Sequence, residues 1–134
     1  MLDRFQKNIG EILTAAADAP AGAVAFHCHS GKDRTGLIAA LTLELVGVAD
    51  TDIAADYALS DRYLAVRYSE MLAEKTDPEE RARLAEQLTS KPEAILGALL
   101  HLKERYGGVD LYLEACELNQ RTRQKLRERM LEPV

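Results

Sequence analysis

The apolar residues of the chain recur mostly at the three- and four-residue spacing of amphipathic helices. In residues 2–18 this spacing places one apolar stripe on a helix, made of Leu2, Phe5, Ile9, Ile12 and Leu13. The pattern returns further along, and it predicts helices over 34–47, 53–59, 60–75, 78–88, 91–108, 110–118 and 120–131. The chain is therefore expected to be dominated by helices.

Several of these helices carry recognisable end signals. Asp77 followed by proline suits the start of the helix over 78–88, because Asp caps free amides and proline fits the first helical turn. Ser60 or Asp61 is a candidate cap that would separate the helix over 60–75 from its predecessor. The paired glycines that close 91–108 suit a helix end.

One segment departs from the helical pattern. Residues 19–22, Ala-Pro-Ala-Gly, stop the first helix, and the short apolar run AVAFHC at 23–28 then favours a buried β-strand. A lone strand leaves its backbone groups unpaired. Three readings follow: other strands are missing from the chain, the segment pairs with another molecule, or it is merely extended. The expected fold class is α/β, mostly helical, with one strand feeding a loop and a helix.

Composition narrows the class of protein. The 134 residues suit one domain over 1–134, and no repeat or linker divides them. A net charge of −5 argues against a nucleic-acid partner. No apolar run approaches the roughly 20 residues of a membrane span. Two cysteines in unrelated contexts and no secretory leader pattern suggest the cytoplasm.

The chemistry of the chain is concentrated in HCHSGKDRTG, residues 27–36. Cys28 and Arg34 are separated by five residues, at the junction of the expected strand and the helix over 34–47. Amides at a helix N-terminus favour an anion, so a loop there lowers a thiol pKa and binds phosphate with the same donors. Gly31 allows the loop to bend, and Arg34 offers a planar fork matched to two phosphate oxygens.

These residues predict covalent phosphoryl transfer without a metal or other cofactor. Cys28 would attack phosphorus, and the loop amides and Arg34 would stabilise charge on the phosphoryl oxygens. Thr35 would donate its hydroxyl proton to the sulfur when the intermediate is hydrolysed. For Asp33 the residues alone indicate a cap for the following helix or an ion pair with Arg34.

The remaining polar residues of the loop have supporting roles. The phosphate-binding set is expected to be His29, Ser30, Gly31, Lys32, Asp33 and Arg34. Lys32 adds a cation that would suit a polyanionic substrate, although a solvated lysine is an ordinary alternative. His27 and His29 flank the cysteine, but no further Cys/His cluster completes a metal site, so no metal is predicted. His27 is expected instead to hydrogen-bond near the loop.

The segment resembles the H-C-x-x-G-x-x-R-[ST] signature of the protein tyrosine phosphatases. Its GKDRTG ending, with DIAADYALSDRYL at 52–64 and LKERYGGVDLYLE at 102–114, is similar to the bacterial tyrosine/serine phosphatases of the atypical, lipid-phosphatase-like subgroup. The resemblance covers essentially the whole chain and corresponds to the family's C-terminal part. It implies that a longer N-terminal portion supplies most of the central sheet and walls of the substrate pocket. It also implies a general-acid role for Asp33 toward the leaving group, with equal weight to the cap or ion pair.

The sequence therefore predicts a cysteine-dependent phosphatase acting on phosphotyrosine, with phosphoserine, phosphothreonine or a phosphoinositide as further substrates. Phosphate, sulfate or vanadate would occupy the loop. The alternative is a remnant of such a phosphatase that binds phosphate or phosphopeptides with little turnover. Self-association through the exposed edge of the 23–28 strand is expected if its partner strands are absent.

Overall fold

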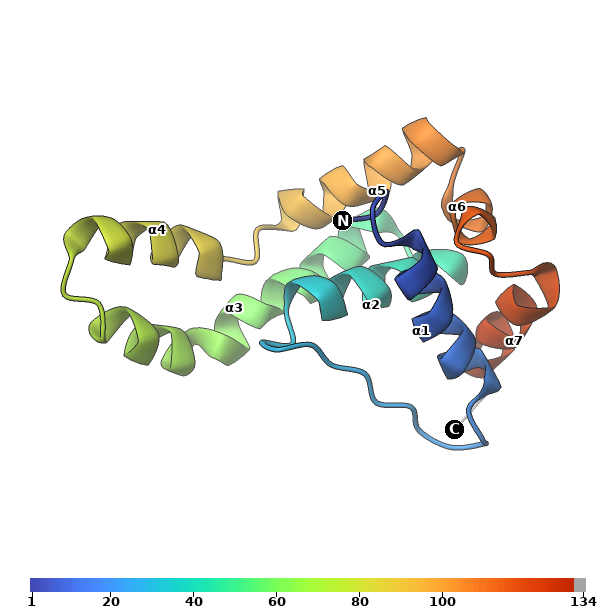
Figure 1. Cartoon of the computed structure of the whole chain (residues 1–134), viewed down its shortest axis with the longest axis horizontal. Helices are drawn as coiled ribbons and strands as arrows, with labels where there is room; N and C mark the ends of the chain where they lie inside the picture. Colours follow the sequence, from blue (N-terminus) through green and yellow to red (C-terminus); the bar gives the residue numbers. More distant parts are fainter. Residues whose placement is uncertain (132–134) are drawn as a thin grey trace.

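Helix α2 (Asp33–Leu45) is the element against which much of the chain packs. A computed structural model describes residues 1–131, and α2 contacts α3, α5, α6 and α7 in it (Figure 1). The other helices are α1 (Gln6–Asp18), α3 (Asp50–Ala73), α4 (Pro78–Leu88), α5 (Pro92–Tyr106), α6 (Val109–Ala115) and α7 (Gln120–Leu131). The prediction of a mostly helical chain is confirmed, and none of the described helices is long and apolar enough to cross a membrane.

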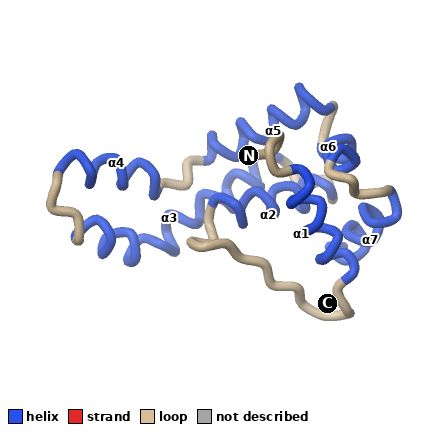
Figure 2. Tube along the Cα trace, in the orientation of Figure 1, coloured by secondary structure: helices blue, strands red, loops and turns tan. Residues whose placement is uncertain are grey.

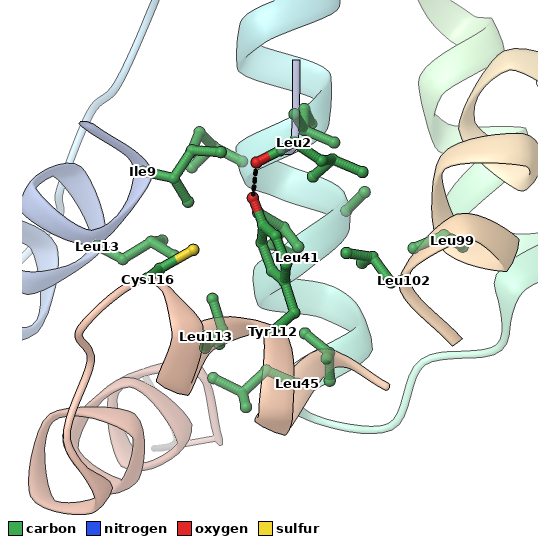
Figure 3. Close-up of a cluster of buried hydrophobic side chains, with 14 of the residues drawn as sticks. Leu2, Ile9, Leu13, Leu41, Leu45, Leu99, Leu102, Tyr112, Leu113 and Cys116 are labelled. Carbon is green, nitrogen blue, oxygen red and sulfur yellow. Dashed lines mark hydrogen bonds between the residues drawn. The ribbon is translucent and has the colours of Figure 1, made fainter. Parts of the chain in front are cut away.

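The core lies where α1, α2, α5 and α6 meet. Leu41 of α2 and Leu99 of α5 are completely buried, as is Tyr112 of α6 (Figure 3). Each such side chain contributes about 1.5–3 kcal/mol by leaving water. The Tyr112 hydroxyl satisfies its hydrogen-bonding need inside the core by donating to the carbonyl of Leu2 at 3.0 Å. This bond ties the N-terminal residues to α6.

Helices α3 and α4 form an antiparallel hairpin that extends away from this core (Figure 1). The predicted start of α4 is confirmed: the Asp77 carboxylate accepts a hydrogen bond from the Glu79 amide at 2.9 Å, and Pro78 is the first helical residue. No residue of α4 is buried. The hairpin is therefore held mainly through α3, which packs on α2 and α5.

The predicted separation of 53–59 from 60–75 is wrong, because α3 runs unbroken through both ranges. Asp61 does not cap a helix. Its carboxylate instead accepts a hydrogen bond at 2.6 Å from the amide of Ser90, which follows α4. A side chain that finds a partner far along the chain cannot compete with the helix for its own backbone. The residue that resembled a cap serves a contact between two segments instead.

The predicted buried strand at 23–28 is also wrong. The segment is extended, as the sequence indicates, but no strand exists among residues 1–131, and Figure 2 draws the whole connection from α1 to α2 as loop. Val24 and Phe26 are exposed rather than buried. No described segment supplies a pairing backbone, so the segment is extended and unpaired within this chain, which all three readings offered by the sequence allow. The α/β class is not seen within the described residues.

Helix α1 is fixed by a close approach that only glycine permits. A Cβ on Gly10 would fall directly on the carbonyl oxygen of Cys116, at the end of α6. The neighbouring residues are well packed, with Ile9 and Cys116 almost fully buried. Backbone atoms of another element cannot move aside as a flexible side chain can.

Gly10→Ala should therefore lower the free energy of unfolding by about 1–3 kcal/mol, through overpacking. Gly97→Ala is the matched control, because Gly97 also lies inside a helix but has no other group within 4 Å of the point where a Cβ would stand. The control should gain about 0.5–1 kcal/mol from the higher helix propensity of alanine. Urea unfolding followed by circular dichroism measures both, and equal effects of the two substitutions would contradict the close approach.

Candidate active site

Cys28 lies in the turn between the extended segment and the start of α2. Gly31 in this turn has φ of 67°, in the left-handed region that glycine adopts without strain. The chain then enters α2, whose first turn includes a hydrogen bond of 2.6 Å from the Gly36 amide to the Lys32 carbonyl. The thiol is therefore held near the N-terminus of a 13-residue helix, where unpaired amides and the helix dipole favour negative charge.

Several donors converge on the sulfur of Cys28. Burial raises the pKa of this thiol, but hydrogen bonds from the hydroxyl and amide of Thr35 and from the amides of Lys32 and Gly31 more than offset it. Together they lower the pKa to about 6. The Thr35 hydroxyl is buried and has no other hydrogen-bond partner among the described residues, so its proton is available to the sulfur. The arrangement favours the nucleophilic thiolate at neutral pH.

The Lys32 side chain is buried and points into the protein rather than toward solvent. Only 5% of the residue is exposed, and its ammonium donates to the carbonyls of Gln87 and Thr89 at 3.2 and 2.9 Å. A third contact, of 2.9 Å, joins it to Asp33 Oδ1. The cation predicted to face a substrate is thus bound to other groups of the protein, while the Lys32 amide remains directed at Cys28.

Asp33 is held by two donors. Its Oδ1 forms an ion pair with the Lys32 ammonium and accepts a hydrogen bond of 2.8 Å from the hydroxyl of Tyr57, which lies on α3. Partial burial raises the pKa of the carboxyl, but the two hydrogen bonds and the Lys32 charge bring it below its ordinary value. The carboxylate is therefore ionised at neutral pH. The ion pair that the sequence offered between Asp33 and Arg34 is made with Lys32 instead.

Tyr57 reaches Asp33 because Gly36 leaves room for its ring. A Cβ on Gly36 would lie 2.6 Å from Cδ2 of Tyr57. Tyr57 is buried and helps to line a cavity of about 410 Å³ that also borders Asp33. Sequence reasoning missed Tyr57, and no local signal reveals it, because the contact spans 24 positions between two helices.

Arg34, the second residue of α2, borders a different cavity from Asp33. Its side chain is exposed and borders a cavity of about 290 Å³, together with Phe5 and Ile9 from the N-terminal region. Within residues 1–131, no hydrogen bond or ion pair engages its guanidinium. The structure brings Cys28, Gly31, Lys32 and Thr35 together, whereas it places the Arg34 side chain beside α1.

The other predicted loop residues are exposed. His29 and Ser30 face solvent, and His27 Nδ1 lies 3.1 Å from the carbonyl oxygen of Cys28. This contact agrees with a hydrogen-bonding role for His27. Across the described part of the chain, no three His, Cys, Asp or Glu side chains are grouped as a metal site would require.

Comparison with known proteins gives a consistent family. Residues 1–132 match the tyrosine phosphatase family. The chain is similar to a tyrosine-protein phosphatase of Nostoc commune, with 31% identity over 96% of this chain and 46% of that protein. It is also similar to the triple specificity protein phosphatase PtpB of Mycobacterium tuberculosis, with 34% identity over 91% of this chain and 48% of that protein.

The chain spans about half the length of these two relatives. The family match nevertheless includes the turn at Cys28, the start of α2 and every helix of the described residues. Both the motif and the comparison therefore lead to one assignment: the chain belongs to the tyrosine phosphatase family.

Proposed function

We propose that this chain is a cysteine-dependent phosphatase that hydrolyses phosphomonoesters through a cysteinyl-phosphate intermediate. The observation that carries the proposal is the position of the Cys28 thiol at the turn before the N-terminus of α2, and the lowering of its pKa by the neighbouring amides and the Thr35 hydroxyl agrees with it. The amides that stabilise a thiolate also suit phosphate oxygens, because both are anions. His29, Ser30, Gly31, Lys32, Asp33 and Arg34 are the proposed phosphate-binding residues, mainly through their amides.

In the proposed first step, the Cys28 thiolate attacks phosphorus, and an S–P bond forms as the bond to the ester oxygen breaks. The departing oxygen takes the electron pair and then a proton. In the second step, water attacks phosphorus, the S–P bond breaks, and inorganic phosphate leaves. Thr35 lies where its hydroxyl can stabilise the sulfur as it leaves, because it is one of the groups that lower the thiol pKa.

Arg34 is the proposed clamp on the phosphoryl oxygens. A guanidinium binds two such oxygens at once and remains charged throughout the reaction. To reach the loop, the side chain must turn away from its place beside Phe5 and Ile9. No partner within the described residues holds it there, so a bound phosphate has little to displace.

Asp33 as the general acid stays a prediction. It is the carboxyl group nearest in sequence to the proposed nucleophile, and a proton donor speeds loss of a basic leaving group. Its lowered pKa sets a condition, because only the protonated form can donate. For Asp33 to act as an acid, substrate binding would have to weaken its hydrogen bond with Lys32 or Tyr57, so that the pKa of the carboxyl rises and a proton is bound.

The proposed substrates are phosphotyrosine first, with phosphoserine, phosphothreonine and phosphoinositides as further classes. The names of the relatives, a tyrosine-protein phosphatase and a triple specificity protein phosphatase, support phosphotyrosine as a substrate together with further substrate classes. A phosphoinositide is the least supported here, because the Lys32 cation that would suit it is already bound within the protein. Two free cysteines fit a reducing compartment, so the cytoplasm is the proposed location.

The 134-residue chain should hydrolyse p-nitrophenyl phosphate near neutral pH. Cys28→Ser should abolish turnover, because a serine hydroxyl stays protonated at that pH and is a far weaker nucleophile than a thiolate. Vanadate should inhibit by occupying the loop. Release of p-nitrophenol measures the rate, and circular dichroism confirms that the variant is folded. Wild-type turnover no faster than that of Cys28→Ser would contradict the enzyme proposal and leave phosphate or phosphopeptide binding as the function of this chain.

The same assay on a series of aryl phosphates tests Asp33. If Asp33 protonates the leaving oxygen, kcat of Asp33→Asn should fall more steeply than that of the wild type as the leaving-group pKa rises. We expect this steeper dependence. Identical slopes would restrict Asp33 to its contacts with Lys32 and Tyr57.

The value of kcat/KM should depend on pH through the Cys28 thiol. With p-nitrophenyl phosphate, whose leaving group departs without needing a proton donor, kcat/KM should follow the thiolate fraction: because the folded protein lowers this pKa to about 6, kcat/KM should rise as pH increases through about 6 and then level off. Initial rates at low substrate concentration, from about two pH units below this midpoint to about three above it, measure its position. A midpoint near the ordinary thiol pKa of about 8.5 would show that the loop does not stabilise the thiolate.

We also propose that the extended segment pairs with the same segment of a second copy. The backbone groups of residues 23–26 make no hydrogen bond to other backbone groups within the described chain, and such groups readily accept another strand. The segment carries no acidic or basic residue apart from His27, so two copies meet without repulsion. Beside it lies an apolar cavity of about 350 Å³, bordered by Phe26, Leu43 and Met130.

Light scattering at tens of micromolar should then give twice the chain mass of 14.8 kDa. Phe26→Lys should give the monomer mass, because a charge on the edge opposes strand pairing. Tyr63→Lys is the control, since Tyr63 is 75% exposed on α3 and lies outside the segment. It should leave the mass unchanged. A wild-type monomer at these concentrations would contradict the pairing.

A further inference from the structure

The Lys32 ammonium has a complete set of partners inside the protein. A lysine has three N–H donors, and three acceptors lie within 3.2 Å of its Nζ: the carbonyls of Gln87 and Thr89 and Oδ1 of Asp33. A buried ammonium must be paired in this way to offset the loss of its hydration. No donor of this group remains for a phosphate oxygen in this arrangement.

The two carbonyl acceptors belong to the C-terminal end of α4. Unpaired carbonyls gather at a helix C-terminus, where the helix dipole also favours a cation. The carbonyls are fixed in turn, because the Ser90 amide that follows them donates to Asp61 of α3 at 2.6 Å. Ser90 is fully buried. Lys32 therefore binds the end of α4 beside a buried, hydrogen-bonded residue.

We infer that Lys32 is a positioning residue, whose side chain anchors the turn before α2 to the C-terminal end of α4 and so holds its backbone amides on the Cys28 sulfur. The inference rests on the proposed role of Cys28 as the nucleophile. It differs from the substrate-facing role that the sequence suggested for Lys32. In this proposal the α3–α4 hairpin helps to stabilise the Cys28 thiolate, because it holds the turn whose amides lower the pKa of the thiol.

The link from side chain to sulfur is short. The Lys32 amide is one of the donors directed at Cys28; the Gly31 amide lies one position before it in the turn, and the Thr35 amide lies three positions after it in the first turn of α2. Tyr57 adds a second tie between α3 and the turn through Asp33. Removing the ammonium frees the turn from α4, so the amides no longer converge on the thiolate.

The test measures the Cys28 thiol itself. The rate of alkylation of Cys28 by iodoacetamide, followed by mass spectrometry across pH, reports its pKa in wild type and Lys32→Met. Methionine keeps the apolar stem and removes the charge. We expect a midpoint of about 6 in the wild type. In Lys32→Met we expect it to rise by about one unit, toward the ordinary thiol value.

Lys7→Met is the matched control, because Lys7 is exposed on α1 and far along the chain from the turn. Its midpoint should equal that of the wild type. Should Lys32→Met fail to fold, Asp61→Ala decides, since it loosens the Ser90 amide and hence the acceptors of Lys32. It should raise the midpoint by a smaller amount.

An unchanged midpoint in folded Lys32→Met, or in Asp61→Ala where that variant decides, would overturn the inference. An unchanged midpoint combined with a raised KM for p-nitrophenyl phosphate would assign Lys32 to substrate binding instead. The outcome is separable from that of the proposed function. A shifted midpoint in a chain without phosphatase turnover would uphold the positioning role while contradicting catalysis.

Discussion

The convergence of backbone amides on the Cys28 sulfur is the constraint on which the proposed chemistry depends. A thiol in water near neutral pH is mostly protonated, and partial burial alone would make Cys28 less acidic still. The amides of the turn and the Thr35 hydroxyl reverse this effect. They can do so only if the chain bends at Gly31 and α2 begins within two residues of that bend, because the donors belong to the turn and to the first residues of the helix.

Packing fixes that geometry from two directions. On one side, the Tyr57 ring packs against Gly36, and its hydroxyl donates a hydrogen bond to Asp33. On the same side, the Lys32 ammonium donates to a carbonyl at the end of α4. On the other side, α2 is embedded in the core through Leu41, which is fully buried. The turn is thus attached to both the core and the α3–α4 hairpin. Of the predicted site, the side chains of His29, Ser30 and Arg34 are exposed and are not held by a partner among the described residues.

Local sequence signals succeeded where structure is decided locally. Asp77 and the proline after it mark the start of α4, and Gly107, with φ of 85°, ends α5 as the paired glycines predict. The motif around Cys28 identified the nucleophile candidate and the bend at Gly31, because both depend on residues a few positions apart. Tyrosine phosphatase membership followed from the same short segment and agrees with the match over residues 1–132.

The failures all involve partners distant in the sequence. The run at 23–28 is extended as predicted, but its burial required a neighbouring strand that the described residues do not contain. Asp61 was read as a helix cap, yet it binds Ser90, 29 positions away. The sequence offered a substrate-facing or a solvated Lys32 side chain, and the acceptors that its ammonium finds in this structure lie at 87 and 89. Sequence spacing sets backbone geometry, whereas the direction of a long side chain is decided by tertiary packing.

The most direct test of Cys28 as the nucleophile is to trap the intermediate. The chain is mixed with p-nitrophenyl phosphate, quenched in acid during turnover, and digested for mass spectrometry. We predict a phosphoryl group on the peptide that contains Cys28, carried by the sulfur, and none in Cys28→Ser. No phosphorylated peptide during turnover, or a phosphoryl group on another residue, would contradict the claim that Cys28 is the nucleophile.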